Sequence, residues 1–138
     1  MSPQVVVAKQ NTNAEQISAR LLAGEFNGLP VVDNNGTVVG IVTAIDILKA
    51  MQGEHGNRQL NTMVAKDIMT RDPSVVKKGA PIEDVIDIMV EKQIELVPVV
   101  EDDGRNKLIG VVARLDILRE KLNEGFIIMG KRGAIAKT

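Results

Sequence analysis

The sequence contains no cysteine, tryptophan or tyrosine, and it has only two phenylalanines and one histidine. The absence of cysteine excludes disulfide bonds and thiolate metal sites. A surface that stacks nucleic-acid bases on aromatic side chains would have almost no rings to use. The single histidine, His55, cannot form a metal site alone, so we interpret it as a solvated residue of the polar, glycine-containing stretch 52–62.

An excess of one charge and long apolar runs are also missing. Seventeen basic residues face eighteen acidic ones, which gives a net charge of −1 at pH 7. This balance provides no general attraction to nucleic acid. No apolar run reaches the ~18 residues that span a bilayer, and the apolar stretch 5–8 is too short for a signal peptide. We therefore expect a cytoplasmic protein with neither a membrane nor nucleic acid as its partner.

A set of catalytic residues is not visible either. There is no cysteine nucleophile, and no serine has a base placed beside it in the pattern. We interpret the acidic stretches 82–87 and 101–104 as a solvated helix face and a hairpin turn, not as a cation site. The sequence therefore predicts a protein that is not an enzyme and that has no metal site.

What the chain does have is an internal repeat of about 55 residues. Residues 27–51 align with 95–122, and the preceding residues 4–26 align with 72–94. The copies are 68 residues apart before a hairpin loop (30 to 98) and 70 after it (46 to 116), so the second copy has two extra loop residues. The matching positions include Pro30 and Pro98, Gly40 and Gly110, and Asp46 and Asp116.

Each copy predicts the element order β-α-β-β-α, an α+β fold repeated twice. The expected first strands are 5–7 and 74–76, and apolar residues at helical spacing predict a helix after each of them. The hairpin strands are 29–33 with 37–42, around a turn at Asn35-Gly36, and 96–101 with 107–112. A last helix starts near Thr43 or Ala113, and we expect Ile45, Ile47 and Leu48 to point inward from it. We place the domains at 1–56 and 63–122, followed by a tail at 123–138. The two small halves should pair about a pseudo-two-fold axis and bury their apolar faces together.

The repeated aspartate has two interpretations. Thr43 lies where a helix N-cap belongs and Asp46 lies at the third helical position, which is a capping arrangement. Ala113 cannot cap, yet Asp116 remains in the second copy. The alternative is a nucleotide site, in which the helix start suits a phosphate and the carboxylate accepts hydrogen bonds from a ribose diol.

The motifs "LPVVD…G.VVGIVTAIDIL" and "VPVVE…KLIGVVARLDIL", with "AKDIMTRDPSVV" at 65–76, resemble the cystathionine-β-synthase (CBS) domain pair, or Bateman module. The resemblance covers Val5 to about Leu122. It implies a sensor of AMP, ADP, ATP or S-adenosylmethionine that needs no cofactor and binds these regulatory ligands in two clefts between the domains. It also implies a homodimer and an unknown effector protein.

The resemblance assigns residues to each cleft. Cleft one would use Thr43, Asp46, Ser74, Val75, Ile94, Leu96 and Pro98. Cleft two would use Asp116, Val6, Val7, Phe26, Gly28 and Pro30, with Arg114 as a possible source of charge. Family members that hold phosphates tightly often carry a basic residue where this chain has Leu96 and Gly28, and Ala113 removes a hydroxyl from cleft two. The sequence therefore favours cleft one for a nucleotide.

Three hypotheses remain open at this point. The first is a regulatory module that binds an adenosyl ligand and acts on a partner protein. The second is a structural dimerisation module that functions without any ligand. The third is a nucleic-acid-binding use of the same fold, against which the balanced charge argues.

Overall fold

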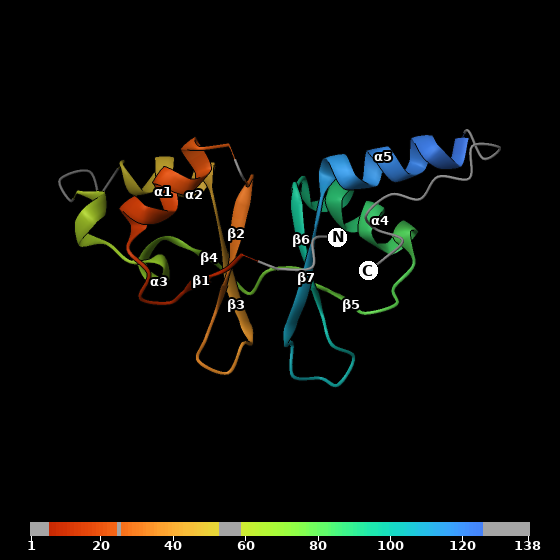
Figure 1. The fold of residues 1–138 in the computed structure, drawn as a ribbon, viewed down its shortest axis with the longest axis horizontal. Coiled ribbons are helices and arrows are strands. Elements are labelled where there is room, and N and C mark those ends of the chain that lie inside the picture. The colour runs from red at the N-terminus through yellow and green to blue at the C-terminus, as the bar shows by residue number, and fades with distance from the viewer. Residues whose placement is uncertain (1–5, 25, 53–58, 126–138) are drawn as a thin grey trace. The chain divides into compact units, whose positions relative to one another are not determined.

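The computed structural model describes residues 6–24, 26–52 and 59–125 of the 138-residue chain. These residues form two compact units that divide between Pro73 and Ser74. We call them the N-terminal unit and the C-terminal unit, and Figure 1 shows the sheet and helices of each.

The N-terminal unit is a four-stranded mixed sheet with helices. Its strands follow the order β1-β2-β3-β4, with β1 parallel to β2 and the other neighbours antiparallel. Its elements are β1 (Ala8–Lys9), α1 (Ala14–Leu22), β2 (Gly28–Val32), β3 (Val38–Thr43), α2 (Ala44–Ala50), the 3-10 helix η2 (Leu60–Thr62), α3 (Ala65–Ile68) and β4 (Thr70–Arg71).

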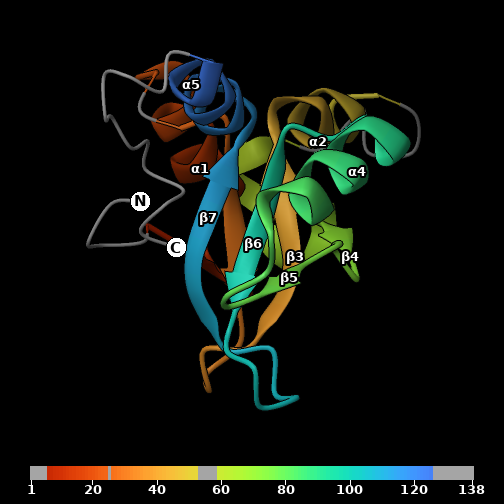
Figure 2. The same ribbon diagram turned by 90° about the vertical axis from the view of Figure 1, so that its right-hand side faces the viewer.

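The C-terminal unit repeats the same plan in its described residues. Its strands follow the order β5-β6-β7, with a parallel and then an antiparallel pairing. Its elements are β5 (Val76–Lys77), α4 (Ile82–Lys92), β6 (Leu96–Val100), β7 (Leu108–Ala113) and α5 (Arg114–Gly125), as Figure 2 shows. The predicted α+β fold and the repeated order β-α-β-β-α are confirmed.

The hairpin predicted at Asn35-Gly36 is confirmed, and its turn is stabilised by a carboxylate. The Asp33 side chain accepts hydrogen bonds from the backbone N–H groups of Asn35 and Thr37, at 2.8 and 3.0 Å. Gly36 has φ +82°, a left-handed conformation that costs glycine little. This local chemistry fixes the register of β2 against β3.

Each unit has its own aliphatic core. The N-terminal core is centred on Ile17, Val31 and Val42, and the C-terminal core on Val85, Val97 and Val112. None of the helices in the described part of the chain is long and apolar enough to cross a membrane.

Two expectations about local structure are wrong. The first strand of each copy lies later than expected, at Ala8–Lys9 and Val76–Lys77 instead of 5–7 and 74–76. Of the three residues expected to point inward from α2, only Ile47 does, because Ile45 and Leu48 are 56% and 55% exposed. Ile47 and Ala50 lie three residues apart on one side of this short helix, and Ile45 and Leu48 lie three apart on another side.

The segment 63–73, which the sequence places at the entry to the second copy, packs within the N-terminal unit. β4 pairs with the edge of β3, and Met63 is fully buried. The N–H groups of Ala65 and Lys66 donate to the carbonyls of Thr12 and Gln10, at 2.8 and 2.9 Å. The predicted domain limits of 1–56 and 63–122 stay a prediction.

The pairing of β4 with β3 leaves no room for a side chain at Gly40. A Cβ atom at this position would lie 2.5 Å from Met69 Sδ and 2.9 Å from the carbonyl oxygen of Thr70. We expect Gly40→Ala to lower the free energy of unfolding by about 1–3 kcal/mol, measured by urea denaturation. In a Met69→Ala background the loss should be smaller, because one of the two obstacles is removed. Equal stability of Gly40→Ala and wild type would contradict this packing.

Candidate ligand-binding site

Asp46 lies in the first turn of α2, and its carboxylate is held inside the N-terminal unit. Oδ2 accepts hydrogen bonds from the N–H and the hydroxyl of Thr43, at 2.8 and 3.1 Å. Oδ1 accepts from the hydroxyl of Thr70 in β4, at 2.8 Å. The residue is only 6% exposed. A carboxylate offers about four acceptor positions, so Asp46 has at most one left and cannot receive both hydroxyls of a diol.

Asp116 lies at the matching place in α5, but its surroundings differ. Its Oδ2 accepts one hydrogen bond from the N–H of Ala113, at 3.1 Å. Its Oδ1 faces the exposed guanidinium of Arg119 at 3.3 Å, and 29% of the Asp116 side chain is exposed. A surface ion pair of this kind contributes about 0–1 kcal/mol and is readily exchanged. Asp116 can therefore offer free acceptor positions to a ligand.

Arg114, considered as a source of charge, has a partner of its own. Its guanidinium forms an ion pair with Glu95, and its backbone N–H donates to the Glu95 carbonyl at 2.9 Å. The Arg114 and Glu95 side chains are 64% and 50% exposed, so this surface ion pair, like that of Arg119, is readily exchanged.

The N-terminal unit contains a pocket of about 300 Å³ beside β1 and α1. Its floor is aliphatic and its polar side chains include the cation of Arg20. It is lined by Val7, Ala8, Thr12, Gln16, Ile17, Ala19, Arg20 and Leu29. Such a combination of apolar wall and few polar groups is typical of small-molecule sites.

The C-terminal unit has an equivalent pocket of about 430 Å³ with the opposite charge. It is lined by Val75, Val76, Lys77, Ala80, Asp84, Asp87 and Ile88. With the repeat spacing of 68 residues, Gln16 corresponds to Asp84 and Arg20 to Ile88. The first pocket therefore carries one cation and no anion, whereas the second carries one cation and two anions. A phosphate is attracted to the first and repelled by the second.

The structure places the other predicted residues around these features without bringing them all together. Val7 and Val75 line the two pockets. Thr43 is the N-cap residue of α2. Val6, Phe26 and Ile94 pack against the cores. Gly28, Pro30, Leu96 and Pro98 are buried in β2 and β6, and Ser74 is half-buried before β5.

Sequence reasoning missed the residues that decide the character of these sites. Thr70 is 24 residues from Asp46 and no motif joins them. Arg20, Asp84 and Asp87 were detectable, because Gln16 and Arg20 are four apart on one helix face and the repeat alignment exposes the charge change. Within the described residues, no group of three or more histidine, cysteine or acidic side chains could hold a metal ion.

Comparison with known proteins gives one consistent family. The profile of the CBS domain matches residues 1–53 and 65–123. Inosine-5'-monophosphate dehydrogenase of Methanocaldococcus jannaschii is 32% identical over 117 residues, which are 85% of this chain and 21% of that enzyme. The chloroplastic CBS domain-containing protein CBSX2 of Arabidopsis thaliana is 29% identical over 84% of this chain. The chain thus spans only 21% and 58% of the length of these two curated relatives.

Two solved structures that are similar to the chain contain adenosyl ligands. CBSX2 in complex with AMP has a TM-score of 0.75 and 31% identity, covering 91% of this chain and 94% of that one. The CBS domain pair of protein MJ0100, in complex with 5'-methylthioadenosine and S-adenosyl-L-methionine, has a TM-score of 0.74 and 30% identity, covering 91% and 93%.

Proposed function

Since the chain belongs to the CBS domain family as a tandem domain pair, we propose that it is a regulatory module that binds an adenosyl ligand and transmits the binding to a partner protein. The observation that carries this proposal is the likeness of nearly the whole chain to two CBS pairs solved with adenosyl compounds. The aligned part is only a fifth of the dehydrogenase. We therefore propose regulation, not catalysis, for this chain.

We propose two assignments, one in each unit: Asp116 in the C-terminal unit accepts ribose hydroxyls, and the Arg20 pocket in the N-terminal unit attracts the phosphate of a nucleotide. The free acceptor positions of Asp116 and the cation of the pocket support this choice. The sequence favours the cleft of Asp46, but we prefer Asp116, because the Asp46 carboxylate already accepts hydrogen bonds from Thr43 and Thr70. The acidic pocket suits only a ligand without phosphate, such as S-adenosylmethionine with its cationic sulfonium.

The test is a ligand panel on the full chain, with AMP, ADP, ATP, S-adenosylmethionine and 5'-methylthioadenosine. A ligand that binds the folded state raises Tm, and a concentration of 100 times Kd contributes about 2.7 kcal/mol. We expect at least one of the five to raise Tm in a saturable way and to give a Kd by isothermal titration calorimetry. If none does, the ligand-independent dimerisation module becomes the better description.

We also propose that the chain forms a homodimer through α2 and α5. Among the large apolar side chains that are more than half exposed on these helices, four come from matching positions of the two copies: Ile45, Leu48, Leu115 and Leu118. Exposed apolar side chains grouped on one helix, as on each of these two, are typical of interaction surfaces. The resemblance to the CBS family implies a homodimer that forms through helices.

The double variant Leu48→Glu/Leu118→Glu should convert the dimer to a monomer, because each buried leucine contributes about 1.5–3 kcal/mol and a buried unpaired carboxylate is strongly unfavourable. Light scattering coupled to size exclusion measures the mass. Lys49→Glu, an exposed charge change on the same helix, should leave the mass unchanged. A wild-type chain that is monomeric at high concentration would contradict the homodimer.

A further inference from the structure

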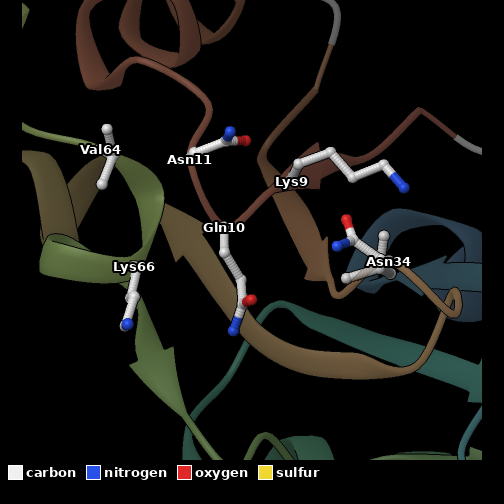
Figure 3. A pocket seen from close by; sticks show the side chains of 7 residues that line it. Lys9, Gln10, Asn11, Asn34, Val64 and Lys66 are labelled. Atoms are coloured by element: carbon white, nitrogen blue, oxygen red, sulfur yellow. The ribbon is translucent and has the colours of Figure 1, made fainter.

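The N-terminal unit contains a second pocket, which the adenosyl proposal does not use. It has a volume of about 280 Å³ and lies where β1, the turn after β2 and the start of α3 meet. Its lining consists of two lysines, three side-chain amides and two valines: Lys9, Lys66, Gln10, Asn11, Asn34, Val32 and Val64. Figure 3 shows Gln10 between Lys66 on one side and Lys9 with Asn34 on the other.

Hydrogen bonds hold the backbone of the three segments that form this pocket, one bond between two of the segments and two bonds within the third. The N–H of Lys66 donates to the Gln10 carbonyl at 2.9 Å, which holds the start of α3 against the segment after β1. Asp33 accepts from the N–H groups of Asn35 and Thr37, at 2.8 and 3.0 Å, which holds the turn that carries Asn34. The polar groups of the pocket therefore project from a fixed backbone.

The pocket lining contains no acidic residue, although two aspartates are close in sequence. Asp33 uses its carboxylate in the turn, and Asp67 accepts from the N–H of Val64 at 3.0 Å. Neither lysine forms an ion pair with any other residue that the structure describes. The two positive charges are therefore available to a ligand.

In the second copy of the repeat, the lysine that corresponds to Lys9 forms an ion pair. With the spacing of 68 residues, Lys9 corresponds to Lys77 and Asn34 to Asp102. Lys77 Nζ lies 3.6 Å from Asp102 Oδ1. In the N-terminal unit an amide replaces this carboxylate, so Lys9 keeps its charge free, and α3 adds Lys66 to the same pocket.

From these observations we propose that this pocket binds a phosphoryl group, either as free phosphate or as the anionic end of a small phosphorylated molecule. The two ammonium groups lie on opposite sides of Gln10 in Figure 3 and attract the anion from either side, and the side-chain amides provide neutral donors. The volume is close to the lower limit of small-molecule sites. This site is separate from the residues proposed for the adenosyl ligand and does not depend on that function.

The test is a titration of the isotope-labelled full chain, followed by the shifts of its backbone amide signals at constant ionic strength. Inorganic phosphate and glycerol 3-phosphate are the two probes, so a free ion and a phosphomonoester are distinguished. We expect saturable shifts centred on Lys9, Gln10, Asn34 and Lys66. No saturable shift with either probe, or shifts centred on Arg20 instead, would overturn the proposal.

Three variants measure the contribution of the charges. Lys9→Gln and Lys66→Gln should each weaken binding about tenfold, the effect of losing one charge-assisted hydrogen bond. Asn34→Asp rebuilds the ion pair of the second copy and should weaken binding about tenfold while keeping both lysines. The matched variant Asp102→Asn should leave it unchanged. Asp116→Asn should also leave it unchanged, which separates this site from the adenosyl site. An Asn34→Asp protein that binds phosphate like wild type would overturn the assignment.

Discussion

Replacing Asp46 with alanine is expected to lower the free energy of unfolding by about 2–4 kcal/mol. The carboxylate is 6% exposed and accepts hydrogen bonds from the Thr43 N–H, the Thr43 hydroxyl and the Thr70 hydroxyl. Its removal leaves these donors without their acceptor and disconnects β4 from the start of α2. Urea denaturation followed by circular dichroism measures the loss, because the fitted midpoint falls while the slope stays constant.

The matched variant is Asp116→Ala, at the same position of the second copy. Asp116 accepts one backbone hydrogen bond, at 3.1 Å, and faces an exposed arginine. Its replacement should cost no more than about 1 kcal/mol, the usual value of a helix-capping group. Equal losses for the two variants would contradict the structural role that we assign to Asp46 alone.

The repeat made most of the fold predictable. Two copies of one pattern test each other, because a strand or helix must appear at matching positions in both. The Asn35-Gly36 turn and the equivalent loop of the second copy fixed both hairpins, and the helical periodicity fixed α1 and α4. The resemblance of the motifs to the CBS pair also predicted the family, which is confirmed.

The errors come from short elements and from contacts between distant residues. α3 and β4 have four and two residues, too few for any periodicity to appear. The sequence could not assign 63–73 to the N-terminal unit, because that assignment depends on pairing with β3. In α2 the residues Ile45 and Leu48 are as apolar as Ile47, so composition did not reveal which face is buried.

The sequence indicates which residue types could bind a ligand, but it does not show which of these side chains are free to bind it. The repeated motif contains both Asp46 and Asp116. The sequence favoured Asp46 because Thr43 precedes it, whereas Ala113 precedes Asp116. The structure shows that the same threonine and Thr70 donate hydrogen bonds to the Asp46 carboxylate, which was expected to bind the ribose. Arg114 likewise has a partner that no motif indicates, Glu95, nineteen residues away. Whether a polar side chain is free is a property of tertiary contacts, not of a motif.

Asp116→Asn is expected to weaken the binding of the adenosyl ligand by about 10- to 100-fold. A carboxylate that accepts two ribose hydroxyls forms charge-assisted hydrogen bonds, each contributing about 1.5–3 kcal/mol, and 1.4 kcal/mol is tenfold in Kd. Asparagine has a similar shape but lacks the charge and offers one acceptor oxygen. Titration calorimetry with the ligand that gives the largest rise in Tm measures Kd for both proteins.

The control for this loss is Asp67→Asn. Asp67 also accepts a backbone hydrogen bond in the first turn of a helix, at 3.0 Å, but it lies outside the residues proposed for the ligand, so Kd should not change.

The variant Arg20→Gln distinguishes the contribution of the phosphate from that of the adenosine. It should weaken AMP, ADP and ATP about tenfold and spare 5'-methylthioadenosine, which has no phosphate for the cation to attract. Equal weakening of all four ligands would mean that Arg20 shapes the pocket and does not attract the phosphate. For the ribose, an unchanged Kd in Asp116→Asn would exclude Asp116 from ribose binding.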